Sequence, residues 1–331
     1  MNTNLRLVVN NENSIDKVSS EKEVLRQRKL NILHQTGHVK ASDLYRHVKT
    51  DDILRPFIEA GFHYDLDEMK IRGGRKHSSD FKAHLVVLSH PELENLVSRF
   101  GIDTQEFAPR IYVWNSYDRS KSVQFDIGFF RGFCWNSLAF GTKIAKTIRI
   151  VHKRLDTEEG IKEFYGDITA AIEKMIQAFK DDVVSTIKTL METEMSEEDQ
   201  IKFAHEALKM RVGHDDDSYV EGDVTSLLKN YEKDGEIIHA DVGNSCWQVL
   251  NRIQRNLGLN FNEEEFLSKI KYSFKSNKLD EEGEQIVKER SLRHVSEPVR
   301  VMDLNKRLMD LMVDYLPEEV QKIEFTEKVA A

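Results

Sequence analysis

The chain has 331 residues, of which 40% are apolar and 32% are charged, and its formal net charge is −9 at pH 7. This length and apolar content predict a sizeable core, organised as one large domain or as one domain with a helical appendage. The acidic balance excludes a surface that is basic throughout, so any contact with nucleic acid must come from a local basic patch.

Cysteine spacing and hydropathy further narrow the class of protein that the chain can be. Cys134 and Cys246 lie far apart without CxxC spacing, which argues against a zinc ribbon or a disulfide framework. No signal-like start and no run approaching ~20 apolar residues is present, so no membrane segment is expected. We therefore expect a soluble cytoplasmic protein, located in the host cytoplasm if a phage encodes it, with no membrane partner and no cofactor.

The first part of the chain predicts an N-terminal segment, a helix and two strands. Residues 1–43 are polar and mixed, with a charged helical stretch at 19–34, and are expected to be flexible or ordered by a partner. Apolar residues three and four positions apart predict a helix over 50–61. Strands are predicted on both sides of a basic, glycine-containing loop, at 62–69 and 81–89.

The strongest local signal is a hairpin in the middle of the chain. Apolar residues alternate along 110–117 and 122–131, and turn-forming residues separate the two runs. This is the pattern of two paired strands joined by a tight turn. A looser alternation predicts a last strand at 144–153.

The remainder is expected to be mostly helical. Apolar residues recur every three or four positions over 157–192, which predicts one long amphipathic helix. Trp247, Asn251 and Gln254 share nearly one helix face and predict a packing seam, with Asn251 and Gln254 bonding across to another element. Helices are also predicted at 196–212, 245–257, 263–274 and 303–315.

Strands that precede helices favour an α+β fold: an antiparallel sheet backed by a long helix, with a helical C-terminal half. The sheet would contain the strands at 62–69, 81–89, 110–117, 122–131 and 144–153. The predicted organisation is a polar segment at 1–43, an α+β core at 44–192 and a mainly helical part at 193–331 packed on the core.

Two basic segments are candidates for phosphate contacts. One surrounds the loop after the first strand and the other follows the last strand, and they would form one patch if those strands were neighbours in the sheet. Trp114 and Tyr117 could stack on unpaired bases. The structural alternative is an ordinary solvated face with aromatic rings in the core. The candidate phosphate-binding residues are Arg72, Arg75, Lys76, Lys82, Arg149 and Lys153.

A second candidate is a polar cluster made of Asn115, Arg131, Asn136 and His152. A histidine beside an arginine could serve proton transfer or phosphate positioning. No nucleophile, carboxylate pair or metal-ligand spacing accompanies these residues. Side chains of this kind equally satisfy loop carbonyls inside a protein, because unpaired buried polar groups are costly.

Other chemistry-bearing residues favour structural interpretations. The acidic run at 214–217 lacks the glycine and the distal glutamate of an EF-hand loop, so a solvated turn is expected and no metal site is predicted. Apolar neighbours make Cys134 a buried residue rather than a nucleophile. Gly73-Gly74 continues into neither a Walker A motif nor GxGxxG.

Several stretches, taken in order, resemble the phage and plasmid-like proteins grouped as domain of unknown function 932. Arg131, Cys134, Asn136 and His152 fall on that family's Arg, Cys, Asn and His positions, whereas Tyr117 replaces a histidine and Arg255 an acidic residue. The resemblance covers residues 45–316. It is carried by Thr50-Asp51-Asp52-Ile53-Leu54, Glu59-Ala60-Gly61-Phe62, Phe81-Lys82-Ala83-His84-Leu85, Asn115-Ser116-Tyr117-Asp118, the helical run from Cys246 to Asn256, Arg293-His294-Val295 and Leu304-Asn305-Lys306-Arg307-Leu308.

The resemblance implies a mobile-element setting but no settled activity. The leading hypothesis is a non-enzymatic phage or plasmid accessory protein that binds nucleic acid, with single-stranded DNA as ligand. A sheet followed by a helix is loosely similar to single-strand annealing proteins, which is an analogy of fold alone. One competing hypothesis is a protein-binding inhibitor of a host defence or restriction system, for which a host or phage protein would be the partner. Another is a nuclease or transferase centred on Arg131 and His152.

Overall fold

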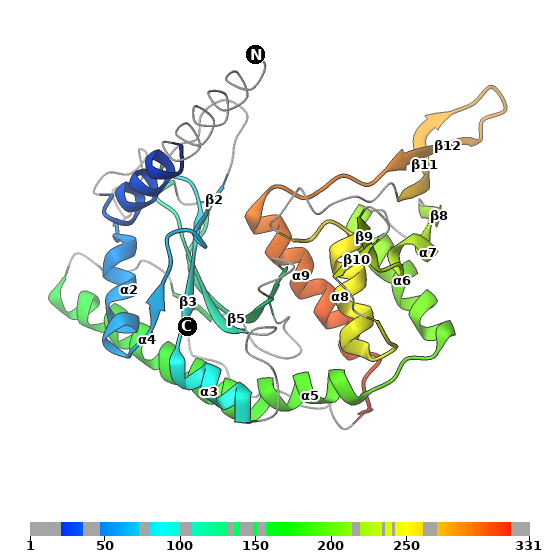
Figure 1. Cartoon of the computed structure of the whole chain (residues 1–331). Helices are drawn as coiled ribbons and strands as arrows, with labels where there is room; N and C mark the ends of the chain where they lie inside the picture. Colours follow the sequence, from blue (N-terminus) through cyan, green and yellow to red (C-terminus); the bar gives the residue numbers. More distant parts are fainter. Residues whose placement is uncertain are drawn as a thin grey trace, which may run out of the picture. The chain divides into compact units, whose positions relative to one another are not determined.

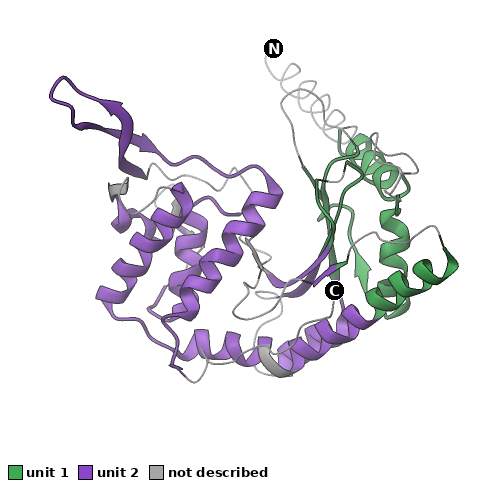
Figure 2. Cartoon of the chain, turned by 180° about the vertical axis from the view of Figure 1, so that it is seen from behind, with its two compact units in different colours: residues 1–88, 113–123, 150–169 green, residues 89–112, 124–149, 170–331 purple. Residues whose placement is uncertain are grey.

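The computed structural model describes residues 21–35, 47–72, 80–99, 108–118, 120–131, 136–139, 148–150, 157–213, 219–233, 236–239, 242–260 and 270–318 (Figure 1). The chain divides into two compact units (Figure 2). Unit 1 contains Met1–Leu88, Val113–Val123 and Ile150–Thr169. Unit 2 contains Ser89–Tyr112, Gln124–Arg149 and Ala170–Ala331.

The central element is a seven-stranded sheet with the order β1-β3-β4-β5-β6, in which β2 also pairs with β3 and β7 also pairs with β5. The pairing of β2 with β3 and of β5 with β6 is antiparallel. Together with the helices this confirms the α+β class. The strands are β1 (His63–Tyr64), β2 (Lys70–Ile71), β3 (His84–Ser89), β4 (Ala108–Asn115), β5 (Val123–Arg131), β6 (Asn136–Ala139) and β7 (Ile148–Ile150).

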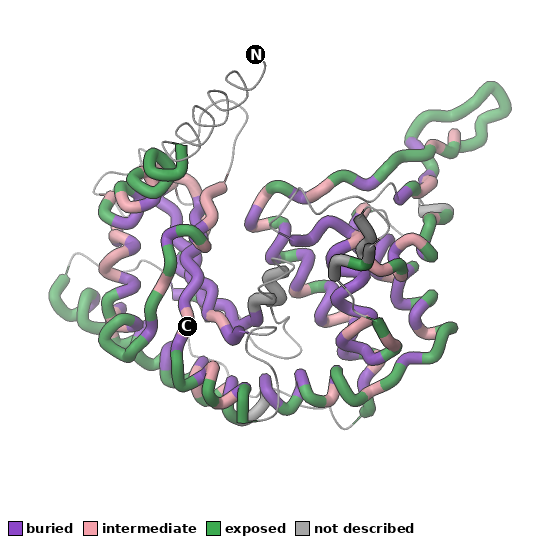
Figure 3. The backbone as a smooth tube through the Cα atoms, viewed as in Figure 1, coloured by how far each residue is buried: buried purple, intermediate pink, exposed green. Residues whose placement is uncertain are grey.

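The hairpin predicted in the middle of the chain is present as β4 and β5. Its turn is closed by Ser116, whose Oγ donates to Lys121 O (2.8 Å) and accepts from Lys121 N (3.0 Å). Seven of the eight residues of β4 are buried, so both faces of this strand are covered (Figure 3). The alternating pattern therefore identified the strand, but it did not reveal that the polar-looking face is also inside.

Two predicted strands differ from the observed ones. The strand expected at 62–69 is broken, because Asp65 accepts a hydrogen bond from Asp67 N (2.8 Å) and forms a turn between β1 and β2. Of the strand expected at 144–153, the described part is β7. Strand β6, which pairs with the end of β5, was not predicted.

The long amphipathic helix is confirmed as a continuous helical run. It consists of α4 (Glu158–Ala178), a π-helical turn η1 (Phe179–Val183) and α5 (Val184–Glu192). The ring of Phe179 meets the ring of Phe129 on β5 edge to face, with centroids 5.9 Å apart. This contact places the helix against the sheet, and the π-turn widens the helix at that point.

Helices predominate in the rest of the described chain, and several of their ends match the predicted signals. Ser196 caps α6 by accepting from Asp199 N, and Gly213 ends α6 with φ 71°. Ser245 and Gln248 form a capping box at the start of α8. The helices outside the sheet are 21–33, α2 (Thr50–Glu59), α3 (Pro91–Arg99), α6 (Glu197–Val212), α7 (Val224–Leu227), α8 (Cys246–Asn256) and α9 (Pro298–Val313).

A second hairpin was missed at the sequence level. Strands β11 (Lys271–Leu279) and β12 (Gln285–Ser291) pair antiparallel, and β11 also pairs with β8 (Tyr219–Gly222). We call β11 and β12 the arm. Residues 271–274 had been predicted as helix, and this is corrected, because the alternation along β11 is polar rather than apolar and gave no strand signal. A further pair, β9 (Tyr231–Lys233) and β10 (Glu236–His239), completes the described strands.

Candidate nucleic-acid interface

The basic loop predicted to contact phosphates is held at both ends by the pairing of β2 with β3. Lys70 pairs with Leu85 and Ile71 with His84, and Arg72 N donates to Ala83 O at 2.9 Å. Arg72 therefore lies at one end of the loop and Lys82 at the other, and both are half-buried. Arg75 and Lys76, which lie between them in sequence, are outside the described residues.

Two lysines were not predicted as part of the site: Lys70 on β2, and Lys29 on the helix at 21–33, which contacts the turn between β1 and β2. Nζ of Lys29 donates to Leu66 O (2.5 Å) and Asp67 O (3.2 Å). Burial, and then the nearby charge of Lys70, lowers the pKa of Lys29, while Asp67 and Asp65 oppose this. Burial likewise lowers the pKa of Lys70. A bound anion would favour the charged form of both lysines.

The helix that carries Lys29 also approaches the far end of the loop. Nε of Arg28 lies 2.7 Å from Oδ1 of Asp80, and both side chains are partly exposed. Because Asp80 comes directly after the loop in sequence, this ion pair connects the helix to the loop's C-terminal end. A surface pair of this kind contributes little to stability.

The two aromatic rings proposed to stack on bases are inside the protein, and that part of the prediction is corrected. Trp114 is 1% exposed and Tyr117 is 0% exposed. Nζ of Lys121 lies 5.2 Å from the centroid of the Trp114 ring. Neither ring offers a face to a ligand, because both side chains are buried.

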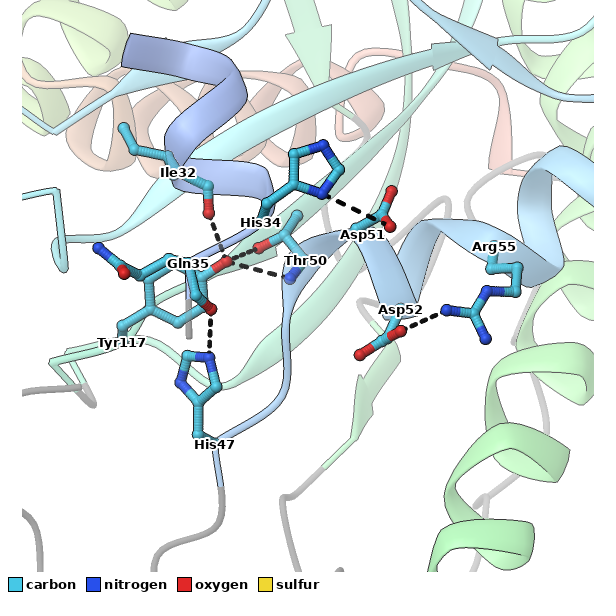
Figure 4. A network of polar contacts seen from close by, with 9 residues as sticks. All are labelled: Ile32, His34, Gln35, His47, Thr50, Asp51, Asp52, Arg55 and Tyr117. Atoms are coloured by element: carbon cyan, nitrogen blue, oxygen red, sulfur yellow. Dashed lines mark hydrogen bonds and ion pairs between the residues drawn. The ribbon is translucent and has the colours of Figure 1, made fainter. Parts of the chain in front are cut away.

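Tyr117 belongs to a buried hydrogen-bond network that joins the turn of the central hairpin to α2 and to the helix at 21–33 (Figure 4). His84 connects the same network to β3. The Tyr117 hydroxyl donates to Ile32 O (2.7 Å) and accepts from Thr50 N (3.0 Å). Thr50 Oγ1 contacts the Tyr117 hydroxyl (2.7 Å) and His84 Nε2 (2.6 Å). Thr50 is the first residue of α2, and its hydroxyl serves this network instead of capping the helix.

When His84 is neutral, the side chains of this network supply fewer donor hydrogen atoms than the number of hydrogen-bond contacts that they make. Four contacts follow one another. Lys82 O contacts His84 Nδ1, and His84 Nε2 contacts Thr50 Oγ1. Thr50 Oγ1 contacts the Tyr117 hydroxyl, which contacts Ile32 O. A neutral imidazole and two hydroxyls supply three hydrogens. Burial lowers the pKa of His84 to about 4, so the ring stays neutral near pH 7. One of the four contacts therefore has no hydrogen atom between its two polar atoms. The arrangement is structural, since none of the three side chains is exposed.

The predicted polar cluster is only partly brought together in the described residues. Asn115 joins the network just described, where its Nδ2 donates to Thr50 Oγ1 (3.0 Å) and Val48 O (3.3 Å). Arg131 and Asn136 are directly opposite each other in the pairing of β5 with β6. The side chains of Arg131 and Asn136, and the whole of His152, lie outside what the structure describes, so the nuclease or transferase hypothesis stays a prediction.

The two basic segments are not on neighbouring strands, which corrects the premise of a single patch. Arg149 is exposed on β7, which pairs with β5, whereas Lys82 precedes β3. Strands β4 and β5 separate β3 from β7 in the sheet order. Lys153 lies outside the described residues. The candidate interface is therefore the β2–β3 loop, with its ends at Arg72 and Lys82.

The described residues offer no alternative metal or thiol chemistry. No group of three or more His, Cys, Asp or Glu side chains that could hold a metal ion occurs in the described ranges. Cys246 is fully buried, and burial raises the pKa of its thiol to about 11. Cys134 lies outside the described residues. Across the part of the chain that is described, no helix combines the length and apolarity that a bilayer crossing demands.

A comparison with protein families gives one match. The family model described as Domain of unknown function (DUF932) matches residues 38–281. No curated protein and no solved structure shows significant similarity to the chain. The match includes β2, β3 and the loop between them, the central hairpin, the long helix and all of β11.

Proposed function

The chain belongs to the family described as Domain of unknown function (DUF932), and from this premise we propose that it is a nucleic-acid-binding accessory protein of a phage or plasmid. Single-stranded DNA is the proposed ligand, and mobile-element DNA metabolism the proposed setting. The setting rests on the family resemblance. The binding activity rests on the described residues around the β2–β3 loop.

The observation that carries the proposal is the hairpin geometry of β2 and β3. The backbone bond from Arg72 to Ala83 closes the loop, so that Arg72 and Lys82 stand at its two ends and the sequence between them adds Arg75 and Lys76. Arg72, Arg75, Lys76 and Lys82 concentrate four cations in a short stretch of the sequence, on a chain whose net charge is −9. Phosphate contacts require a local basic patch and do not require a basic protein.

Lys29 and Lys70 add positive charge to the same unit. Lys29 is buried and Lys70 is half-buried. Burial, and then the positive charge of Lys70, lowers the pKa of Lys29. Because Trp114 and Tyr117 are buried, binding would depend on phosphate contacts rather than on base stacking, and would be strongly salt-dependent and nearly independent of sequence.

Fluorescence anisotropy with labelled oligothymidylate and a labelled duplex tests the proposal. The double variant Arg72→Gln/Lys82→Gln is expected to weaken binding to the single strand by about tenfold or more, because it removes two charge-assisted contacts. Lys162→Gln is the matched control, since Lys162 is an exposed lysine on α4 in the same unit. Equal affinity of the double variant and the control would overturn the assignment of this loop.

A second candidate function is supported by the arm. Leu279 and Val287 are 60% and 54% exposed there, and the turn between the strands carries Asp280 and three glutamates. Exposed apolar side chains beside an acidic turn are features of a protein-binding surface. The chain would then inhibit a host defence or restriction factor. Substituting Leu279 and Val287 by serine would abolish capture of that factor and leave oligonucleotide binding unchanged.

A further inference from the structure

Strand β12 forms an open edge of the arm. The strand order β12-β11-β8 places β11 in the middle, so that within the described residues β12 pairs on one side only. Every residue of β12 is exposed or half-buried, and the arm is exposed along most of its length (Figure 3). The outward N–H and C=O groups of an edge strand can pair with a further strand. The arm therefore offers a backbone surface on which another chain can add.

The outer part of the arm is thin and carries exposed apolar side chains. Strand β8 pairs with β11 from Tyr272 to Phe274, and beyond Phe274 the described arm is a ribbon of two strands. An isolated two-stranded ribbon is only marginally stable in water. Leu279 and Val287 are nevertheless 60% and 54% exposed there. A strand added beside β12 would widen this ribbon and cover part of its apolar surface.

The pairing of β11 with β12 shows which side chains of β12 share a face. Lys288 lies opposite the buried Phe274, whereas Val287 lies opposite Lys275. Side chains alternate along a strand, so the even-numbered residues of β12 share the face of Phe274 and the odd-numbered ones lie on the other face. Residues directly opposite each other in a sheet lie on the same face. When two copies of β12 pair antiparallel, odd residues must therefore face odd ones, and the two-fold axis passes through a single residue.

The charges of β12 select one register for such a pair. With the axis at Lys288 the two lysines would face each other, and with the axis at Glu289 the two glutamates would. Like charges directly opposite each other are destabilising. With the axis at Val287 the two valines face each other instead. The neighbouring pairs are then Ile286 with Lys288 and Gln285 with Glu289, which contain no like charges.

The same register brings opposite charges together at both ends of the paired segment. Residue 287 lies midway between Glu284 and Arg290, so Glu284 of each copy faces Arg290 of the other. The backbone of Glu284 is fixed by Asp280, whose N donates to Glu284 O (2.9 Å) and whose Oδ1 accepts from Glu284 N (2.8 Å). Within the described residues, neither Glu284 nor Arg290 has an ion-pair partner. An axis one residue earlier would draw the turn at 281–283 into the pairing.

We propose that two copies of this chain associate through β12, antiparallel and with Val287 at the two-fold axis, so that the two arms form one continuous sheet. The occupant of the edge is a second copy, because β12 complements itself in charge and apolar contact in this register. The paired segment, 284–290 in each chain, is short, so the association is expected to be weak and to depend on concentration. This inference goes beyond the nucleic-acid function and does not rest on it.

Sedimentation velocity of the full chain over a range of concentrations measures the association. Glu284→Arg would place two arginines opposite each other at both ends of the segment, and Arg290→Glu would place two glutamates there. Each variant alone should weaken the association by about tenfold, because like charges replace opposite ones. An equimolar mixture of the two variants should regain it, because in the mixed pair every arginine again faces a glutamate.

Glu282→Arg is the matched control, since Glu282 is an exposed glutamate of the same turn that lies outside the paired segment. It changes the net charge as much as Glu284→Arg and should associate like the wild type. Equal weakening by both substitutions would show that net charge is responsible, and would overturn the register. Recovery in the mixture can come only from contact between chains, and a variant that failed to fold would not recover.

A wild type that stays monomeric at every concentration would overturn the proposal. So would a mixture that associates no better than the separate variants. In either case Leu279 and Val287 would be left to a protein of another kind, which is the partner expected for the second candidate function. Oligonucleotide binding is measured separately, so its failure would leave the association of the arms untouched.

Discussion

Nζ of Lys306 on α9 lies 2.5 Å from Oδ1 of Asp126 on β5, although 180 residues separate them in the chain. The two side chains are 12% and 1% exposed. The second oxygen of the carboxylate accepts from Gln124 Nε2 at 2.8 Å. Within unit 2 this buried ion pair fastens the last helix to the central sheet, next to the contact between α9 and β6.

Removing the lysine of this pair should destabilise the protein strongly. Lys306→Met removes the cation that pairs with the buried Asp126 carboxylate, and breaking a buried ion pair typically costs about 3 kcal/mol or more. Urea unfolding measures the change in free energy, and Arg307→Met, the next and exposed residue, provides the control. Replacing both partners by Lys306→Met/Asp126→Leu should restore most of the loss. If Lys306→Met were as stable as Arg307→Met, the ion pair between Lys306 and Asp126 would not stabilise the protein.

The hydroxyl of Thr50 should matter more than its methyl group. It contacts the side chains of His84, Tyr117 and Asn115, so Thr50→Val leaves several buried polar atoms without their partner. We expect a loss of about 2 kcal/mol for valine and clearly less for serine, which keeps the hydroxyl. Chemical denaturation of both variants checks the order. Equal losses would show that packing of the methyl group dominates.

The buried imidazole of His84 should make stability depend on pH in an acidic window. Burial lowers its pKa from 6.5 to about 4 in the folded chain. Between these values the unfolded chain binds a proton that the folded chain does not, so stability falls as the pH drops from 6.5 towards 4. The shift corresponds to about 3 kcal/mol across this window. Unfolding free energies of wild type and His84→Gln should converge as the pH falls, and parallel curves would contradict the assignment.

The thiol of Cys246 should be unreactive in the folded protein. It is fully buried, and burial raises its pKa to about 11, so little thiolate forms at neutral pH. In a Cys134→Ser background, labelling by a thiol reagent should wait for unfolding of α8 and accelerate sharply in denaturant. Rapid labelling under native conditions would show that this helix opens on its own.

Elements with strong local signals were predicted well. The central hairpin and the long helix follow from apolar periodicity, and Ser196, Gly213 and Ser245 mark helix ends as expected. The seam on α8 was also confirmed in part: Gln254 Nε2 donates to Asn305 Oδ1 on α9 (2.9 Å), while Asn251 bonds within its own helix. Such features depend on residues close in sequence or on one helix face.

Features set by long-range pairing were not predicted. A sequence pattern identifies a strand but not its neighbours, which is why the basic segments near Lys82 and Arg149 were placed side by side when β4 and β5 separate them. The polar arm gave no apolar alternation. His84 carried the one local signal of the buried network, a histidine beginning an otherwise apolar strand, but its partners Thr50 and Tyr117 come from distant parts of the chain.

The sequence predicted which residue types form the candidate interface, but not how they are arranged in the fold. Arg72 and Lys82 were identified because they are cations around a glycine-containing loop, and the pairing of β2 with β3 places them at its ends. Lys29 was missed because it lies on a helix distant in sequence and reaches the turn between β1 and β2 only in the folded chain. The burial of Trp114 and Tyr117 could not be read from the alternation, since it requires the second face of the sheet to be covered.

The salt dependence of oligothymidylate binding by the full chain tests the central claim most directly. If the four cations of the β2–β3 loop each contact a phosphate, the logarithm of the association constant should fall with the logarithm of salt concentration with a slope of about −3. The Arg72→Gln/Lys82→Gln variant should show a slope of about half that size. Absence of binding at low ionic strength, or a slope near zero, would contradict phosphate recognition by this protein.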